Sequence, residues 1–336
     1  MKFILLPVWF ATVFATLGRA DEPYHFLKES PVAGDGGWDY LSVDSAAQRL
    51  YVSHATKVVV IDLANDAVVG EITNTPGVHG LAPAPALGRG MATCGRENKA
   101  AIVDLKTLAT ISKVDTGANP DGMLYEPGQQ EFYTFNGRGQ SATVIDAKTA
   151  KVVATIPLGG KPEFAQADPK NGLVFDNLED KDEVVVIDAK THTVKNHWPI
   201  APNEEGSGLA FDAANQRLFI GCGGSKTMAM MDSTSGKILA SVPIGDGVDA
   251  NAFDPGTHFA FASCGDGTTT IAKEDGDRLT LVQTLKTERS ARTMTIDPAT
   301  HKIYLAAAKF DAPAEGQRRG KIVPGTFKIL VYGPAK

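Results

Sequence analysis

The chain has 336 residues, and 33 Lys and Arg stand against 39 Asp and Glu, so its formal net charge is −6. An acidic balance argues against broad attraction to phosphate backbones, which depends on clustered basic side chains, and nucleic acid is therefore not an expected partner. After the first twenty residues, no stretch is long and apolar enough to predict a membrane-spanning helix.

Residues 1–20 have the pattern of a signal peptide. A basic residue follows the first methionine, residues 3–17 are almost wholly apolar, and Gly18 and Ala20 place small residues where a signal peptidase cleaves. The alternative is a membrane anchor, but this apolar run is shorter than the roughly 20 residues that span a bilayer. Pro7 also interrupts the run. We therefore expect cleavage after Ala20.

Cleavage would release a mature chain, residues 21–336, into the periplasm or the medium. It removes two basic residues and no acidic one, so that the net charge changes from −6 to −8. We expect a periplasmic or secreted acidic protein without a membrane span.

From residue 24 onwards, one sequence pattern returns along the chain with a period of about 42 residues. Each copy holds a short apolar run, a turn with Asp, a second apolar run, a polar loop, a run such as Val-Val-Val-Ile-Asp, and a last alternating run. Residues 161–200 show the pattern most clearly. Four short strands per copy at this period are typical of a propeller blade.

Seven copies follow one another, and the seventh ends one strand short. The first begins at Trp38 and the seventh at Met294. Residues 24–30, YHFLKES, alternate like a missing fourth strand, so we predict that they pair with residues 328–333, KILVYG, and close the ring. An open ring would leave sheet edges and the apolar faces of the end blades in water. The predicted fold is all-β: one seven-bladed β-propeller domain of four-stranded blades, residues 21–336.

Three kinds of segment carry a family resemblance: RLYVS at residues 49–53, NPDG at residues 119–122, and Val-rich runs such as residues 58–62. With them the chain resembles the YVTN-repeat, YncE-like seven-bladed propellers over nearly all of residues 24–336. The resemblance implies the same fold and an exported surface-layer, binding or cofactor-supporting module. It also implies an alternative, single-stranded DNA binding, which is described for one type of member.

The copies differ most informatively at the loop that enters the innermost strand, where a propeller has the mouth of its central channel. Aligning GW-D-Y, GV-H-G, NP-D-G and their counterparts places at one equivalent position Asp39, His79, Asp121, Glu163, Ser207, Asp249 and Arg292. We expect these side chains to bind a small polar ligand, with Trp38 beside them as an aromatic wall.

Carboxylates gathered in a narrow mouth repel one another, so their ionised forms are costly unless a positive group lies among them. Oxygen ligands suit a hard divalent cation such as calcium, and a histidine also admits zinc. The candidate metal ligands are Asp39, His79, Asp121, Glu163 and Asp249. The alternative is a set of solvated charges in a water-filled channel, satisfied by backbone amides.

A second equivalent set, in the second strand of each copy, includes all three cysteines. It consists of His54, Cys94, Asn136, Asn177, Cys222, Cys264 and Ala307. Three cysteines leave at least one unpaired, and we expect small buried thiols. No C-x-x-C-H spacing supports covalent haem, and no glycine fingerprint at a strand-to-helix junction supports a nucleotide cofactor.

The connection at residues 309–325 is much longer than its counterparts and rich in Gly and Pro, with Arg318 and Arg319 at its middle. An insertion of this kind is either a functional lid or a disordered segment. A lid over the channel would bring these two arginines and Arg292 to an anionic group, which guanidinium groups bind through forked hydrogen bonds.

Three functions fit these residues. The first is a binding or scaffold module for a small polar ligand, a divalent cation or a protein partner at the mouth. The second is a metal-dependent hydrolase or lactonase, in which a bound cation polarises a carbonyl and His79 or Glu163 transfers a proton. The third is single-stranded DNA binding, which the net charge disfavours. A serine hydrolase is not expected, because Ser207 lies in no G-x-S-x-G elbow.

Overall fold

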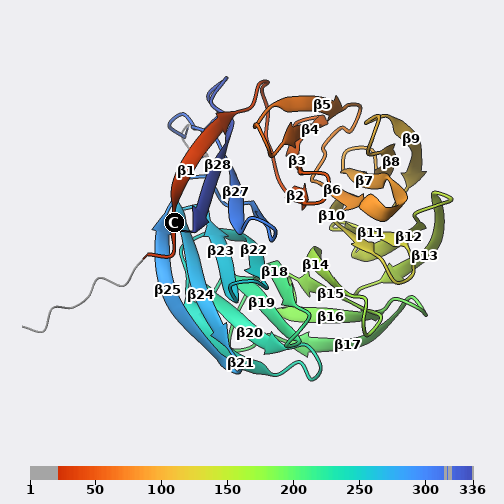
Figure 1. Cartoon of the computed structure of the whole chain (residues 1–336). Helices are drawn as coiled ribbons and strands as arrows, with labels where there is room; N and C mark the ends of the chain where they lie inside the picture. Colours follow the sequence, from red (N-terminus) through yellow and green to blue (C-terminus); the bar gives the residue numbers. More distant parts are fainter. Residues whose placement is uncertain (1–21, 314–315, 317–319, 335–336) are drawn as a thin grey trace, which may run out of the picture.

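Twenty-eight strands form seven antiparallel four-stranded sheets in the computed structural model, which describes residues 22–313, 316 and 320–334. The sheets are arranged as blades around a central axis (Figure 1). The predicted seven-bladed propeller is therefore confirmed. The predicted signal peptide, residues 1–20, lies outside the described residues. In the part that is described, no helix has the length and apolar character needed to cross a membrane.

Each blade is built from consecutive strands, numbered here from the centre outwards. Blade 1 consists of β2 (Leu41–Asp44), β3 (Arg49–His54), β4 (Lys57–Asp62) and β5 (Val68–Ile72). Blade 2 consists of β6 (Leu81–Ala84), the 3-10 helix η1 (Pro85–Leu87), β7 (Arg89–Cys94), β8 (Lys99–Asp104) and β9 (Thr110–Asp115). Blade 3 consists of β10 (Pro120–Glu126), β11 (Glu131–Asn136), β12 (Ser141–Asp146) and β13 (Lys151–Pro157).

The remaining blades repeat this order. Blade 4 consists of β14 (Pro162–Asp168), β15 (Leu173–Leu178), β16 (Glu183–Asp188) and β17 (Thr193–Pro199). Blade 5 consists of β18 (Gly206–Asp212), β19 (Arg217–Cys222), β20 (Thr227–Asp232) and β21 (Ile238–Pro243). Blade 6 consists of β22 (Val248–Asp254), β23 (Phe259–Cys264), β24 (Thr268–Asp275) and β25 (Arg278–Lys286). Blade 7 consists of β26 (Met294–Asp297), β27 (Lys302–Ala307), β28 (Lys328–Pro334) and β1 (Tyr24–Pro31).

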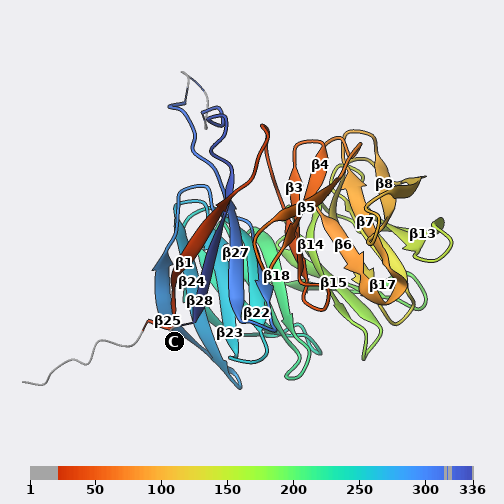
Figure 2. The ribbon, with the colours of Figure 1, turned by 45° about the horizontal axis from the view of Figure 1, so that its top comes forward.

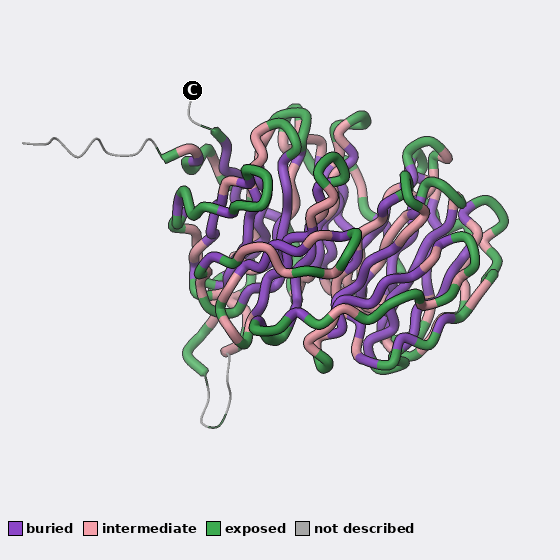
Figure 3. Tube along the Cα trace, turned by 90° about the horizontal axis from the view of Figure 1, so that it is seen from below, coloured by how far each residue is buried: buried purple, intermediate pink, exposed green. Residues whose placement is uncertain are grey.

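The hydrophobic core lies between neighbouring blades. The second and third strands of a blade, such as β3 and β4, are buried on both faces, whereas outer strands such as β13 are largely exposed. Tyr51 and Val60 of blade 1, for example, pack with Ala92 and Val103 of blade 2. Figure 3 shows these buried strands inside the exposed turns. A strand covered on both faces reads as a continuous apolar run, which explains the Val-Val-Val-Ile pattern.

The Asp that ends many third strands closes the turn to the fourth strand. In blade 3, the Oδ1 of Asp146 accepts hydrogen bonds from the backbone N–H groups of Lys148 and Thr149, at 3.1 and 2.6 Å. The same Asp accepts the Thr149 hydroxyl, and the hydrogen bonds from Thr149 hold the pKa of Asp146 below its usual value. This Asx-type turn is the physical reason for the recurring Asp-Ala-Lys-Thr sequence.

Strands from the two ends of the described chain close the ring. β1 pairs with β28 in antiparallel register from Tyr24 opposite Pro334 to Pro31 opposite Lys328, and Figure 1 shows them side by side. The predicted pairing of residues 24–30 with 328–333 is therefore confirmed. Tyr24 is buried, its ring packs edge-on against Phe261 at 5.1 Å, and its hydroxyl donates to the His301 carbonyl at 2.6 Å.

The long connection between β27 and β28 forms an upright arm. Phe310 and Ile322 make an antiparallel bridge, and the Asp311 N–H donates to the Lys321 carbonyl at 2.9 Å. Figure 2 shows the described parts of this arm rising away from the ring beside blade 7. Whether this connection is a lid over the channel or a disordered segment stays a prediction, because residues 314–315 and 317–319 lie outside the described residues. Arg318 and Arg319 lie outside the described residues.

Replacing the closing tyrosine tests the ring. Tyr24→Ala removes a buried ring between blades 6 and 7, so the free energy of unfolding should fall by about 3 kcal/mol or more. Phe26→Ala on the same strand is the control. Phe26 is 50% exposed, and its loss should cost less than about 1 kcal/mol. Urea unfolding of the mature chain measures both, and equal losses would contradict the role given to β1.

Candidate functional site

The seven residues predicted to surround the mouth lie at or next to the start of each innermost strand. In blades 3 to 6 the pairing at this start is irregular. In blade 3, Pro120 faces Asn136 and Met123 faces Thr134, so three positions on β10 correspond to two on β11. One extra residue on the inner strand is a β-bulge, and a bulge changes the direction of a side chain. Asp121 lies within this bulge. The predicted ring position is thus a local break in the sheet.

Asp39, His79 and Asp121 meet at one side of the mouth. The Nδ1 of His79 lies 2.7 Å from Oδ2 of Asp39 and 3.0 Å from Oδ1 of Asp121. Burial lowers the pKa of His79, but hydrogen bonds to the carboxylates of Asp121 and Asp39 raise it more, to about 10. The imidazole is therefore positively charged at neutral pH and offsets one of the two carboxylates. Burial is also the main cause that raises the pKa of Asp39.

Glu163 lies in a nearly closed environment. Its side chain is 13% exposed, the Tyr40 hydroxyl donates to Oε1 at 3.2 Å, and Nζ of Lys161 lies 3.3 Å from Oε2. Burial and the charge of Asp121 raise the pKa of Glu163 to about 8, although Lys161 lowers it. Lys161 is shared, because it also pairs with Glu179. The charge of this shared lysine therefore does not outweigh the effect of burial on the pKa of Glu163.

Asp249 and Arg292 form an ion pair across blades 6 and 7. Nη1 of Arg292 lies 3.0 Å from Oδ1 of Asp249, whose other carboxylate oxygen is buried without a hydrogen-bond partner. Burial raises the pKa of Asp249 to about 7 in spite of Arg292, and the charge of Asp39 adds to the increase. The Ser263 hydroxyl holds the backbone carbonyl of Arg292 and so fixes the position of the arginine.

Ser207 and Trp38 are the other two residues predicted at the mouth. Ser207 is buried, and its carbonyl accepts a hydrogen bond from the Asn177 amide at 2.7 Å. Trp38 lines a cavity of about 340 Å³ with Asp39 and His79, but its ring also stacks on Phe327 at 5.1 Å. Trp38 is therefore both a cavity wall and a packing residue.

The second predicted set needs one correction. Pro162 of blade 4 pairs with Leu178, as Pro120 of blade 3 pairs with Asn136, so Leu178 and not Asn177 is the equivalent residue. The alignment by residue type was wrong by one position, and one position turns a side chain to the opposite face of a strand. Asn177 instead points at blade 5, where its amide donates to the carbonyls of Ser207 and Gly208.

The remaining members of the second set contribute to packing between blades. The three cysteines are free and buried in hydrophobic clusters. Burial raises the pKa of Cys94 to about 11 and the pKa values of Cys222 and Cys264 to about 12. The ring of His54 stacks on Phe327 at 4.4 Å, and burial lowers the pKa of His54. Asn136 is buried and donates to Thr143 at 3.0 Å, and Ala307 is also buried.

Sequence reasoning missed several polar residues near the mouth. Lys161 pairs with Glu163, as described above, and Asp176 of β15 is fully buried. Burial raises the pKa of Asp176 well above its usual value. The sequence did contain a signal for Asp176. A carboxylate stands there at the strand position that the apolar Val52 and Ala92 occupy in blades 1 and 2.

Two groups of described residues bring metal-ligand atoms within 4.8 Å of one another. The first is Asp39, His79 and Asp121 at the mouth, where a metal ion would have to replace the proton on Nδ1 of His79. This set of one nitrogen and two carboxylates fits zinc or a similar ion. Glu163 and Asp249, also predicted as ligands, do not belong to the group.

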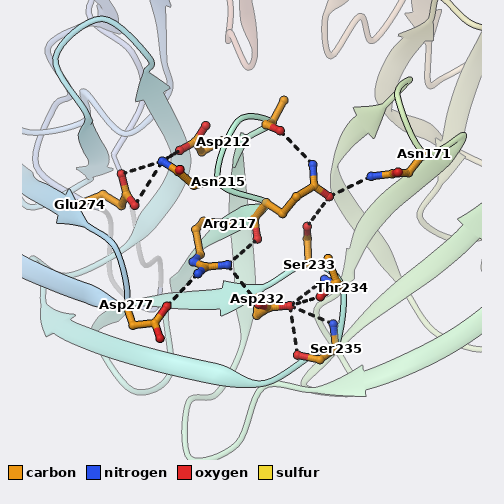
Figure 4. A network of polar contacts seen from close by, with 12 residues as sticks. Asn171, Asp212, Asn215, Arg217, Asp232, Ser233, Thr234, Ser235, Glu274 and Asp277 are labelled. Carbon is orange, nitrogen blue, oxygen red and sulfur yellow. Dashed lines mark hydrogen bonds and ion pairs between the residues drawn. The ribbon is translucent and has the colours of Figure 1, made fainter.

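The second group lies at the opposite end of the inner strands, between blades 5 and 6, and Figure 4 shows Asp212 and Glu274 of this group. It comprises Asp212, His258 and Glu274. The Asn215 amide donates to Oδ2 of Asp212 at 2.8 Å, and Nδ1 of His258 lies 3.1 Å from Oε2 of Glu274. Close by, Arg217 forms ion pairs with aspartates of both blades. We interpret these contacts as a structural network, because each carboxylate has its own polar partner.

The fold and this geometry define a seven-bladed β-propeller with ionisable groups gathered at one mouth of its channel. A similar structure is found in hydrazine synthase of Kuenenia stuttgartiensis, with a TM-score of 0.73 and 16% identity over 84% of this chain and 96% of that chain. A chain in a mitotic checkpoint complex gives a TM-score of 0.73 and 14% identity over 91% of this chain and 95% of that chain. No protein-family model and no curated protein matches the sequence. At these identities the likeness shows the fold alone.

The His79 contacts predict a pH dependence of stability. The raised pKa of folded His79, about 10, means that its contribution is fully present below the usual value of 6.5 and is lost as the pH rises towards 10. In His79→Gln, the free energy of unfolding should fall less steeply between pH 7 and 10 than in the native chain. Urea unfolding across this range measures the slope, with the exposed His25→Gln as control. Equal slopes in all three proteins would contradict the geometry.

Proposed function

We propose that the protein is an exported propeller of the YVTN-repeat kind that acts as a binding module. Its channel mouth binds either a small polar ligand that carries a positively charged group or a divalent cation. The signal-peptide pattern of residues 1–20 supports export, and the repeat motifs support the family. The single observation that supports the ligand is the burial of Glu163 and Asp249 beside other carboxylates, which raises the pKa values of both.

These two acids reveal a shortage of positive charge at the mouth. Glu163 and Asp249 have side chains 13% and 12% exposed, and their pKa values are raised to about 8 and about 7. Burial is the first cause in both, and neighbouring carboxylates add to it. A cation placed between such acids favours their ionised forms, so its binding is coupled to the release of protons. The mouth is thus suited to a cationic group.

Calorimetric titration of the mature chain tests this coupling. Calcium, zinc and propylamine, each titrated separately, are the probes, in two buffers with different enthalpies of ionisation. At least one probe should bind saturably, should release protons, and should bind about tenfold more tightly at pH 9 than at pH 6, a change of about 1.4 kcal/mol. Glu163→Gln should reduce the proton release.

The matched control is Asp275→Asn, an exposed residue at the opposite end of blade 6. This substitution should leave the titration unchanged. Absence of saturable binding for all three probes, or binding with the same affinity at both pH values, would rule out the proposed cation site.

A metal-dependent hydrolase or lactonase is the second candidate, and the meeting of Asp39, His79 and Asp121 favours it. A divalent ion held there would polarise a carbonyl or activate water. His79 would then be a ligand, so the proton transfer would fall to Glu163, whose pKa burial raises to about 8.

Chelation tests the hydrolase directly. Hydrolysis of an aryl ester or a lactone by the zinc-loaded chain should be lost after chelation, return with zinc, and fall at least about a hundredfold in Glu163→Gln, the usual scale for a general acid or base. In that variant zinc should still bind. Turnover that persists unchanged after chelation, or no turnover with zinc or calcium, would eliminate this candidate.

A further inference from the structure

We propose that the ligand of the mouth is a zwitterion, with its anionic end at Arg96 and Arg138 and its cationic end on the acidic side formed by blades 4 to 6. This inference rests on the proposed function and names the chemical class of the ligand. The inference is based on the charged residues in the turns between the second and third strands, which surround the seven mouth residues.

The structure makes the equivalent positions in these turns unambiguous. The second residue after each second strand is Thr56, Arg96, Arg138, Asp180, Gly224, Asp266 and Lys309 in blades 1 to 7. Positive charge therefore occurs on the neighbouring blades 2 and 3 and on blade 7, and negative charge occurs on blades 4 and 6. A repeat protein has no structural need for this distribution, because the same turn tolerates Thr and Gly in other blades. The two arginines are thus carried by one pair of neighbouring blades.

Arg96 and Arg138 have no charged partner among the described residues. Both side chains are exposed, neither forms an ion pair, and both line the cavity of about 340 Å³ that also contains Asn119 and His79. Two unpaired guanidinium groups at one cavity are suited to a carboxylate or a phosphate, since each presents a planar fork of donors.

The turns that carry Arg96 and Arg138 lie directly against the mouth residues His79 and Asp121. The turn that carries Arg96 begins with Gly95, and a Cβ atom there would lie 2.9 Å from Nε2 of His79. Any side chain at this position would separate the turn from the ring. The turn that carries Arg138 begins likewise with Gly137, whose Cβ would lie 3.9 Å from Oδ2 of Asp121. A ligand bound by the arginines therefore reaches the edge of the channel mouth.

The opposite side of the mouth has a surplus of acids. A second cavity, of about 520 Å³, is lined by two arginines and by the carboxylates of Glu179, Glu205, Asp246, Asp249 and Asp266. Five carboxylates therefore stand against two guanidinium groups, and the raised pKa of Asp249 makes its share of the negative charge smaller than that of the other four. Lys161 and Lys226 pair with two of these acids from outside the cavity lining, which reduces the surplus without reversing it.

A ligand with both charges fits this arrangement better than a simple ion. A simple anion at the arginines would be repelled by the acids, and a simple cation on the acidic side would leave Arg96 and Arg138 unpaired. Both effects act over the Debye length of about 8–10 Å at physiological salt. An amino acid, a short peptide with free ends, or an aminoalkyl phosphate has the required charges.

Glycine oligomers with free ends, from diglycine to pentaglycine, are the probes for the test, because each residue extends the distance between the charges by about 3.5 Å. Each is titrated into the mature chain at low salt beside its C-terminal amide and its N-acetyl derivative. Phosphoethanolamine and ethanolamine form a second matched pair, which separates a phosphate from a carboxylate ligand. One or more free zwitterions should bind at least about tenfold more tightly than the matched derivative that lacks one charge.

The double variant Arg96→Gln/Arg138→Gln identifies the anionic subsite. Both residues are exposed, so the fold should be retained, which the urea midpoint verifies. In this variant the advantage of the free oligomer over its amide should disappear, and the binding of propylamine should remain. Arg278→Gln, an exposed arginine at the opposite end of blade 6, is the control and should change neither.

Each contrary result has a separate meaning. If the amide binds as tightly as the free oligomer, the ligand is a simple cation, and the inference is overturned while the proposed cation site stands. If the N-acetyl form binds as tightly, the arginines alone act, and the inference is again overturned. If neither the zwitterions nor calcium, zinc or propylamine bind, the proposed function fails together with the inference.

Discussion

Closure of the ring is the constraint on which the rest of the molecule depends. A single blade leaves the apolar faces of its second and third strands uncovered, and it becomes stable only between two neighbours. The antiparallel pairing of β1 with β28 completes the seventh blade, so that every blade has a neighbour on each side. The same closure brings the start of seven inner strands to one opening. Residues that are about 42 positions apart in the sequence thereby become neighbours at the mouth.

That convergence creates the electrostatic problem of the mouth. Four carboxylates meet there, and the chain supplies His79, Arg292 and Lys161 against them. The compensation is incomplete, because burial keeps the pKa of Glu163 raised to about 8 and that of Asp249 to about 7. Holding uncompensated carboxylates at largely buried positions costs folding free energy, and a structural role alone would be met equally well by neutral side chains. A ligand with a positive group offsets this cost, which links the energetics of the fold to binding.

The fold could be predicted from the sequence because period and alternation are local signals that repeat seven times. The position of Asp39, His79 and Asp121 could be predicted for the same reason, since one alignment places all of them. Contacts between different blades could not be predicted: no pattern indicated that Tyr40 of blade 1 reaches Glu163 of blade 4, or that Lys161 is shared with Glu179. The Asn177 assignment was wrong because residue type was followed where strand register decides. The bridge between Phe310 and Ile322 could not be predicted either, because no pattern in residues 309–325 indicated it.

The central claim is that the mouth lacks positive charge until a ligand supplies it. The most direct measurement is a titration of the side-chain carboxyl carbons of Glu163 and Asp249, followed by carbon NMR of the labelled mature chain and assigned with the two amide variants. The account predicts midpoints near pH 8 and pH 7 in the free protein, and a decrease of both when a saturating cationic ligand is added. Midpoints near pH 4 for both carboxyls in the free protein, unchanged by any ligand, would contradict it.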